Sequence, residues 1–123
     1  MWTSIRTKRL RISPRQRQLV DSFVRRTFDR ELRQIGSVVV TLSPAKIGTA
    51  LGYTCGVRIW SHYLGLITAR DVGDTVRNAV QQASLRARKA LRRRLHKRHD
   101  AGRRISQRQH SRPELSDYEA RFL

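Results

Sequence analysis

The stretch from Asp71 to His99 constrains this chain more than any other part of it. Its first half places apolar side chains at the three- and four-residue spacing of an amphipathic helix, for which Asp71 is a suitable N-cap. Its second half, from Arg86 to Arg98, holds eight basic residues in 13 positions and no acidic one. Like charges four residues apart destabilise an isolated helix, so solvation alone does not account for this run. We predict a helix that packs on a core through its first half and meets an anion through its second.

The charge of the whole chain indicates the same kind of partner. The 123 residues include 27 basic and nine acidic ones, a formal net charge of +18, and 23 of the basic residues are Arg. A guanidinium can hold two phosphate oxygens at once and can stack on a base, whereas self-repulsion at this charge opposes a compact state. Nucleic acid is therefore the predicted partner, ahead of an anionic membrane or an acidic protein.

Cysteine content and hydropathy indicate the cellular compartment of the protein. Cys55 is the single cysteine, which excludes an internal disulfide and fits a reducing environment. No apolar run reaches the roughly 18 residues that a membrane span needs. The N-terminal residues lack the apolar block of a signal peptide. These features predict a cytoplasmic protein without a membrane partner.

The first part of the chain predicts a strand, a helix and a second strand. Weak alternation over residues 3–12 favours a short strand with an extended lead-in. Ser13 and Pro14 suit the N-cap and first position of a helix, whose apolar stripe continues up to Gly36. Gly36 is expected to end that helix in a left-handed conformation. The β-branched run over residues 37–43 predicts a strand.

Two further strands are predicted before the long helix. Residues 44–52 contain Pro and Gly as breakers and are expected to form a connection. Alternation predicts strands over residues 53–60 and 63–70, joined by a hairpin turn at Ser61-His62.

The resulting order, β-α-β-β-β-α, is typical of an α+β two-layer sandwich. We predict a largely antiparallel four-stranded sheet with both helices packed on one face, which leaves the other face to solvent or to a ligand. The folded domain is expected over residues 1–99, followed by a flexible tail over residues 100–123. Within that tail, residues 114–123 are either a disordered end or a short motif that docks on this domain or on a partner.

A helical wheel refines the prediction for the second helix. Near the middle of its apolar face lie Val72, Ala83 and Ala90. Roughly opposite lie Arg88, Lys89 and Arg92. Arg94 projects back onto the apolar face, where an unpaired charge is not buried. We therefore expect the helix to extend past the sheet by about residue 94.

The sequence offers little for catalysis. It has no phosphate-binding loop motif and no recognisable pair of carboxylates for acid–base work, and His96 and His99 lack further metal ligands. Cys55 lies on an apolar strand face and is expected to be a core thiol. We predict no enzyme activity, no catalytic residue, no metal site and no cofactor. Trp60 lies on the opposite strand face. Two roles remain open for it, packing at the edge of the sheet or forming a stacking platform for a base.

The order and spacing of several segments resemble the ribosome hibernation factors, the ribosome-associated inhibitor/hibernation-promoting family also called sigma-factor modulation proteins. The resemblance covers roughly residues 3–98. The segments that carry it are Ile5 to Ser13 leading into Pro14, the stripe through Phe28 and Leu32, SVVVTLS at 37–43, and Asp71-Val72 opening a helix with Val76, Ala79 and Val80. The chain is too short for the second, dimerising domain of long members, so a short form that is monomeric off the ribosome is expected.

The resemblance implies the same fold and a noncatalytic role in ribosome hibernation, a form of translation regulation associated with stress. Family members bind the small ribosomal subunit and block translation by occupying the messenger- and transfer-RNA path. It further implies that basic residues of the second helix, and others around the first strand, face ribosomal RNA. The matching positions are Arg86, Arg88, Lys89, Arg92, Arg93 and Lys97 on the helix, with Arg6, Lys8 and Arg9 around the strand.

Two other hypotheses remain open at the level of the sequence. The α-β-β-β-α portion has the element order of double-stranded RNA-binding domains, so a generic double-stranded RNA or DNA binding domain is the alternative. A protein-interaction module, whose acidic and aromatic C-terminal residues dock on a partner, is the third.

Overall fold

The structure, a computed structural model, describes residues 1–108, with side chains through Arg98. The chain divides into two units, residues 1–91 and 92–123. Its elements are β1 (Trp2–Thr7), α1 (Pro14–Thr27), the 3-10 helix η1 (Asp29–Glu31), β2 (Ser37–Ile47), β3 (Ala50–Ser61), β4 (Gly65–Gly73) and α2 (Val76–Arg108). The domain limit predicted at residue 99 lies inside α2, and the predictions for residues 109–123 fall outside the described residues.

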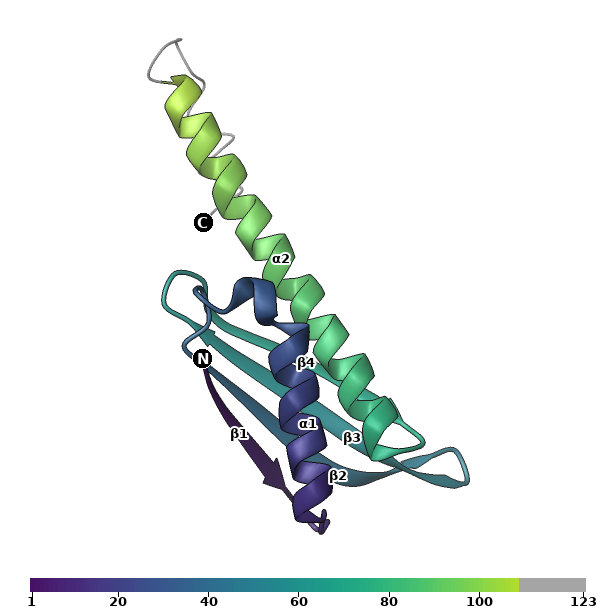
Figure 1. Ribbon diagram of the computed structural model, residues 1–123. Helices are drawn as coiled ribbons and strands as arrows, with labels where there is room; N and C mark the ends of the chain where they lie inside the picture. Colours follow the sequence, from purple (N-terminus) through teal and green to yellow (C-terminus); the bar gives the residue numbers. More distant parts are fainter. Residues whose placement is uncertain (109–123) are drawn as a thin grey trace. The chain divides into compact units, whose positions relative to one another are not determined.

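The four strands form one mixed sheet in the order β1-β2-β3-β4. β1 runs parallel to β2, which requires a crossover that α1 supplies, and the other two pairs are antiparallel. Figure 1 shows α1 and the first part of α2 over the same face of this sheet. The predicted α+β two-layer sandwich is confirmed.

The sheet face beneath the helices forms the core. Alternate residues of the central strands point into it, such as Val40 and Val57, which are paired across β2 and β3 and are fully buried. Phe28 and Leu91 are also fully buried, the first just after α1 and the second on α2. Each large apolar side chain buried in this way contributes roughly 1.5–3 kcal/mol to folding.

Helix α1 starts as predicted and ends earlier. Ser13 and Gln16 form a reciprocal capping box, in which each backbone N–H donates to the other side chain, at 3.0 and 3.1 Å. The α-helix stops at Thr27, so the predicted helix up to Gly36 is wrong. Gly36 does not have a positive φ either: its N–H donates to the Trp60 carbonyl at 2.8 Å, and its own carbonyl accepts from Trp2 at 3.0 Å. Pairing with the sheet thus takes the place of the predicted helix cap.

The hairpin between β2 and β3 replaces the predicted connection over residues 44–52. The strands stay paired as far as Ile47 and Ala50, and Gly48 turns the chain with φ +63°. Pro44 is tolerated inside β2 because β1 pairs with β2 only as far as Leu42, so no strand needs a backbone donor on that side. Pro44, which was expected to interrupt the strand, therefore lies in an edge segment of a longer strand.

The turn between β3 and β4 also differs from the prediction. Ser61 pairs with Gly65, so the turn consists of His62, Tyr63 and Leu64 instead of Ser61-His62. Gly65 has φ +76°, a conformation that glycine adopts without the cost a Cβ imposes.

Helix α2 starts later than predicted. β4 extends to Gly73 and includes Asp71, which is paired with Cys55, so Asp71 is not the N-cap. Thr75 takes that role, and its hydroxyl accepts from the Asn78 N–H at 3.1 Å. Gly73 permits this tight entry, because a Cβ at that position would lie 2.9 Å from the backbone carbon of Asn78.

The buried stripe of α2 is rotated from the predicted one. Its buried residues are Ala79, Val80, Ala83, Ser84, Ala87 and Leu91. Ala90, predicted near the middle of the apolar face, is only half-buried, and Val72 belongs to β4. Arg88 follows Val80 and Ser84 at four-residue spacing, so it lies at the margin of the buried stripe and not opposite it. Four of these six buried residues are Ala or Ser, so small side chains make up most of the buried stripe.

Candidate nucleic-acid interface

Arg86 is anchored at the edge of the sheet. Its Nε lies 3.4 Å from Oδ2 of Asp71, and its Nη1 donates to the Arg70 carbonyl oxygen at 3.2 Å. The Arg86 side chain is nevertheless 66% exposed. The strand therefore orients a guanidinium that still presents donors to solvent, a geometry suited to a phosphate.

The other two predicted helix residues of the first unit, Arg88 and Lys89, differ in exposure. Lys89, three residues after Arg86, is exposed and offers a flexible ammonium. Arg88 is half-buried, and its Nε is buried with no hydrogen-bond partner among the described residues. Arg86 and Lys89 are thus presented to a ligand in this unit, whereas Arg88 is largely held against the protein.

The remaining predicted helix residues belong to the second unit. Arg93 and Lys97, four residues apart on α2, are exposed, and Arg92 is half-buried. Within the described side chains of this unit, residues 92–98, there is no carboxylate to compete with a phosphate for these cations.

The N-terminal residues are not brought together with Arg86. Arg6 is paired with Thr41 on the sheet face opposite to the helices, because its neighbour Ile5 is paired with the buried Val40 on the core face. Lys8 and Arg9 follow β1 and are exposed, and Arg9 has φ +56°. The structure thus places Arg6 on a different surface from the basic residues of α2.

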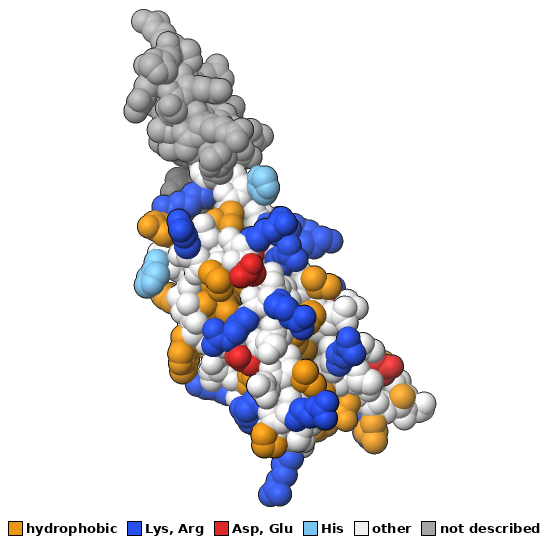
Figure 2. Space-filling model, in the orientation of Figure 1, with side chains coloured by type: hydrophobic (Ala, Val, Ile, Leu, Met, Phe, Trp, Pro, Cys, Tyr) orange, Lys and Arg blue, Asp and Glu red, His pale blue; other side chains and the backbone are white. Residues whose placement is uncertain are grey.

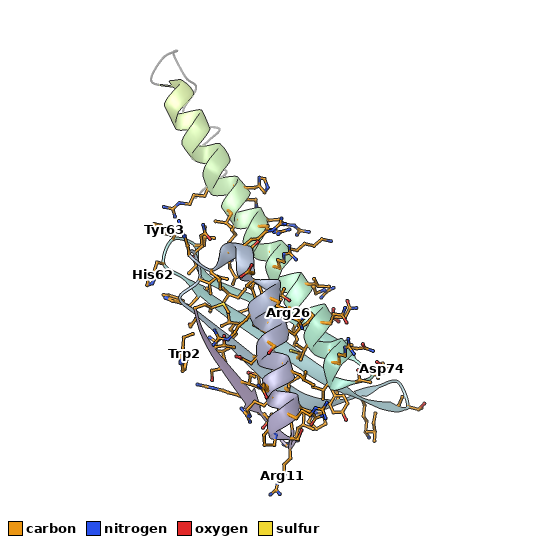
Figure 3. All side chains as sticks on the ribbon, viewed as in Figure 1. Trp2, Arg11, Arg26, His62, Tyr63 and Asp74 are labelled. Carbon is orange, nitrogen blue, oxygen red and sulfur yellow. The ribbon has the colours of Figure 1, made fainter. Side chains whose placement is uncertain are left out.

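Helix α1 adds basic residues that were not among the predicted site residues. Arg26 lines an apolar groove of about 340 Å³ between α1 and α2, together with Arg77 and side chains that include Leu19 and Phe23. Figure 2 shows Lys and Arg side chains spread over this helix-bearing face with few acidic ones, and Figure 3 shows Arg26 on α1. The sequence did carry a signal for Arg26, since this residue lies on the polar side of the apolar stripe of α1.

Three further findings concern the Cys55 thiol, metal binding and membrane-spanning helices. Burial raises the pKa of the Cys55 thiol to about 12, so the reactive thiolate is not formed at neutral pH. Among the described residues, no three His, Cys, Asp or Glu side chains are grouped so that they could hold a metal ion. None of the described helices is long and apolar enough to cross a membrane.

Comparison with known proteins bears on the fold. No protein-family model matches the sequence, and no curated protein matches it. Solved structures share the fold, and two of them illustrate the match. A ribosomal subunit interface protein from Coxiella burnetii is 15% identical, with a TM-score of 0.63, over 76% of this chain and 96% of that one. The Protein Y N-terminal domain from Thermus thermophilus is 16% identical, with a TM-score of 0.57, over 76% and 98%. The resemblance expected from the sequence is confirmed at the level of the fold: this chain folds like members of the hibernation-promoting factor family.

Proposed function

We propose that this protein is a ribosome-associated translation inhibitor that binds ribosomal RNA of the small subunit and occludes the messenger- and transfer-RNA path. The observation that carries the proposal is the shared fold with a ribosomal subunit interface protein, which spans 96% of that chain. A net charge of +18 supports it, since a polyanion such as ribosomal RNA would neutralise this charge.

The geometry of α2 supports RNA binding through phosphates. Arg86 and Lys89 are exposed in the first unit, and Arg93 and Lys97 are exposed in the second. Contacts of this kind position a protein on a nucleic acid without reading its sequence, and folded RNA is recognised mainly by shape. Inhibition would then come from occupying space, with no chemical step and no cofactor.

Sedimentation with separated ribosomal subunits at low and moderate salt tests this proposal. We expect the protein to sediment with the small subunit at both salt concentrations and to inhibit translation when added to a cell-free system. Absence of both effects would overturn the proposal.

Competition separates the ribosomal function from the alternative, a generic double-stranded RNA or DNA binding domain. A large excess of an unrelated RNA or DNA duplex should leave small-subunit binding largely intact. If the duplex displaces the protein as readily as free subunits do, the generic duplex binder is the better description. Its affinity would then fall steeply with salt for every duplex alike.

A further inference from the structure

The sheet face away from the helices carries both tryptophans of the chain in one cross-strand row. Trp2 is paired with Ser37, and Ser37 is paired with Trp60, which is in turn paired with Leu66. The neighbouring row, Thr3, Val38, Ile59 and Ile67, belongs to the core face. Because side chains alternate along a strand, both indoles lie on the open face.

The two indoles are exposed and are held by a shared backbone connection. Trp2 is 63% exposed and Trp60 is 51% exposed. Gly36 accepts from the Trp2 N–H and donates to the Trp60 carbonyl, and Cδ1 of Trp60 lies 3.7 Å from where a Gly36 Cβ would stand. Adjacent strands are about 4.8 Å apart, so strands β1 and β3 are roughly 10 Å apart, with only the small Ser37 side chain between the tryptophans.

The next rows of this face are basic and otherwise small. Arg6, Arg58 and Arg70 are exposed on it, among Ser, Thr and Gly residues and the half-buried Val39. Asp71 is the single Asp or Glu within the four strands, and it lies on the helix side, where it pairs with Arg86. The open face therefore combines exposed aromatic rings with positive charge and no opposing carboxylate within the strands.

We propose that this open face binds single-stranded RNA, with bases stacked on Trp2 and Trp60 and phosphates contacted by Arg6, Arg58 and Arg70. Exposed aromatic rings beside a basic surface are the arrangement by which proteins hold single strands without reading their sequence. A second copy of this chain is a poorer occupant, since three arginines would face three arginines. The choice of RNA over DNA rests on the proposed function, whereas the choice of a single strand rests on this face alone.

Tryptophan fluorescence tests this proposal directly, because Trp2 and Trp60 are the two tryptophans of the chain. Titration of the whole protein with a 12-nucleotide uridine oligomer should quench the emission, since bases stack on the indoles. Trp60→Ala should weaken binding, measured with a labelled oligomer, by at least about fivefold, whereas Trp60→Phe should retain most of the affinity because it keeps an aromatic ring. Circular dichroism of both variants checks that the fold is intact.

Matched controls lie on the other face. Leu19→Ala removes a similarly exposed apolar side chain from α1 and should leave oligomer binding unchanged. Arg58→Ala should weaken binding and lower its salt dependence, whereas Arg15→Ala, at an exposed position of α1, should do neither.

Several outcomes overturn the proposal. They are an absence of quenching, equal quenching by a duplex, a preference for the matching deoxythymidine oligomer, or an oligomer affinity that Trp60→Ala does not change. A Trp60-dependent dimer seen by analytical ultracentrifugation would assign the face to a second copy instead. Small-subunit sedimentation is a separate measurement, so failure here and failure of the proposed function can be told apart.

Discussion

Arg86 on α2 and Asp71 on β4 form an ion pair across the edge of the sheet, with 3.4 Å between Nε and Oδ2. Because the Arg86 side chain is 66% exposed, solvent screens this pair, and it contributes little to stability. Its consequence for binding is competition: the carboxylate occupies a guanidinium that a phosphate could also use, while the Arg70 carbonyl also holds that guanidinium.

Asp71→Asn should therefore strengthen RNA binding while changing stability by less than about 1 kcal/mol. An Asn side chain keeps an oxygen for the Val72 N–H, which donates to Asp71 at 2.8 Å, but it no longer competes for Arg86. Asp74→Asn is the matched control, because it removes the same charge next to Asn78 instead of Arg86. Filter binding with ribosomal RNA measures both; an equal gain in the two variants would mean that only net charge matters.

Reversal of the two exposed α2 cations of the first unit, Arg86→Glu with Lys89→Glu, should abolish most small-subunit binding without unfolding the protein. If each cation neutralises one phosphate, the slope of log affinity against log salt should also fall by about 2. The control, Arg11→Glu with Lys46→Glu, changes the net charge equally at exposed positions outside α2. Figure 3 shows Arg11 near the start of α1. Equal loss in both variants would contradict a role for α2.

The corresponding pair in the second unit, Arg93→Glu with Lys97→Glu, is tested separately. Arg93 and Lys97 are exposed, so we expect reduced sedimentation with the small subunit and an unchanged unfolding midpoint. Unchanged sedimentation would confine the interface to the first unit.

Gly73→Ala should destabilise the fold by about 1–3 kcal/mol, because the added Cβ would meet the backbone of the first turn of α2. Gly56→Ala is the matched control, since a Cβ there would have no atom within 4 Å and the site also lies in a strand. Denaturant unfolding monitored by circular dichroism measures both. A similar loss at Gly56 would attribute the effect to strand glycines in general.

Stability should depend on Cys55 at high pH. Its pKa is raised from 9.0 to about 12 in the folded protein by burial. The contribution is therefore fully present below pH 9 and is lost as the pH rises toward 12, at up to about 1.4 kcal/mol per pH unit. Urea unfolding from pH 8 to 11 should show this additional fall in the protein and not in Cys55→Ala. Parallel pH profiles of the two proteins would contradict it.

Much of the fold could be predicted because the signals were local. The helix start at Ser13 and Pro14, the alternation through Val57 and Ile59, and the apolar spacing through Val80 and Ala83 each depend on residues close in the chain. Such signals determine which elements form and in which order. They also placed Trp60 and Arg58 on the strand face opposite to Cys55.

The predictions that were wrong concern places where distant segments meet. Gly36 does not cap the helix, because it hydrogen-bonds to Trp2 and Trp60 instead, and the helix ends at Thr27. Pro44 remains in a strand because β1 stops at Leu42, and no sequence window shows where a neighbouring strand stops. Arg88 lies beside the buried stripe of α2, and contacts with distant strands decide which side of a helix packs on a sheet.

By itself, the sequence determined the element order, the excess of arginine and the expectation of a nucleic-acid partner, since these depend on composition and short-range periodicity. The tertiary structure alone decided which basic side chains are exposed to a ligand and on which surface they lie. Packing of α2 on the sheet set Arg86 against Asp71, and strand register placed Arg6 on the opposite face and aligned Trp2 with Trp60 across Ser37. Register is a relation between segments far apart in the chain, so it emerges only when the strands pair.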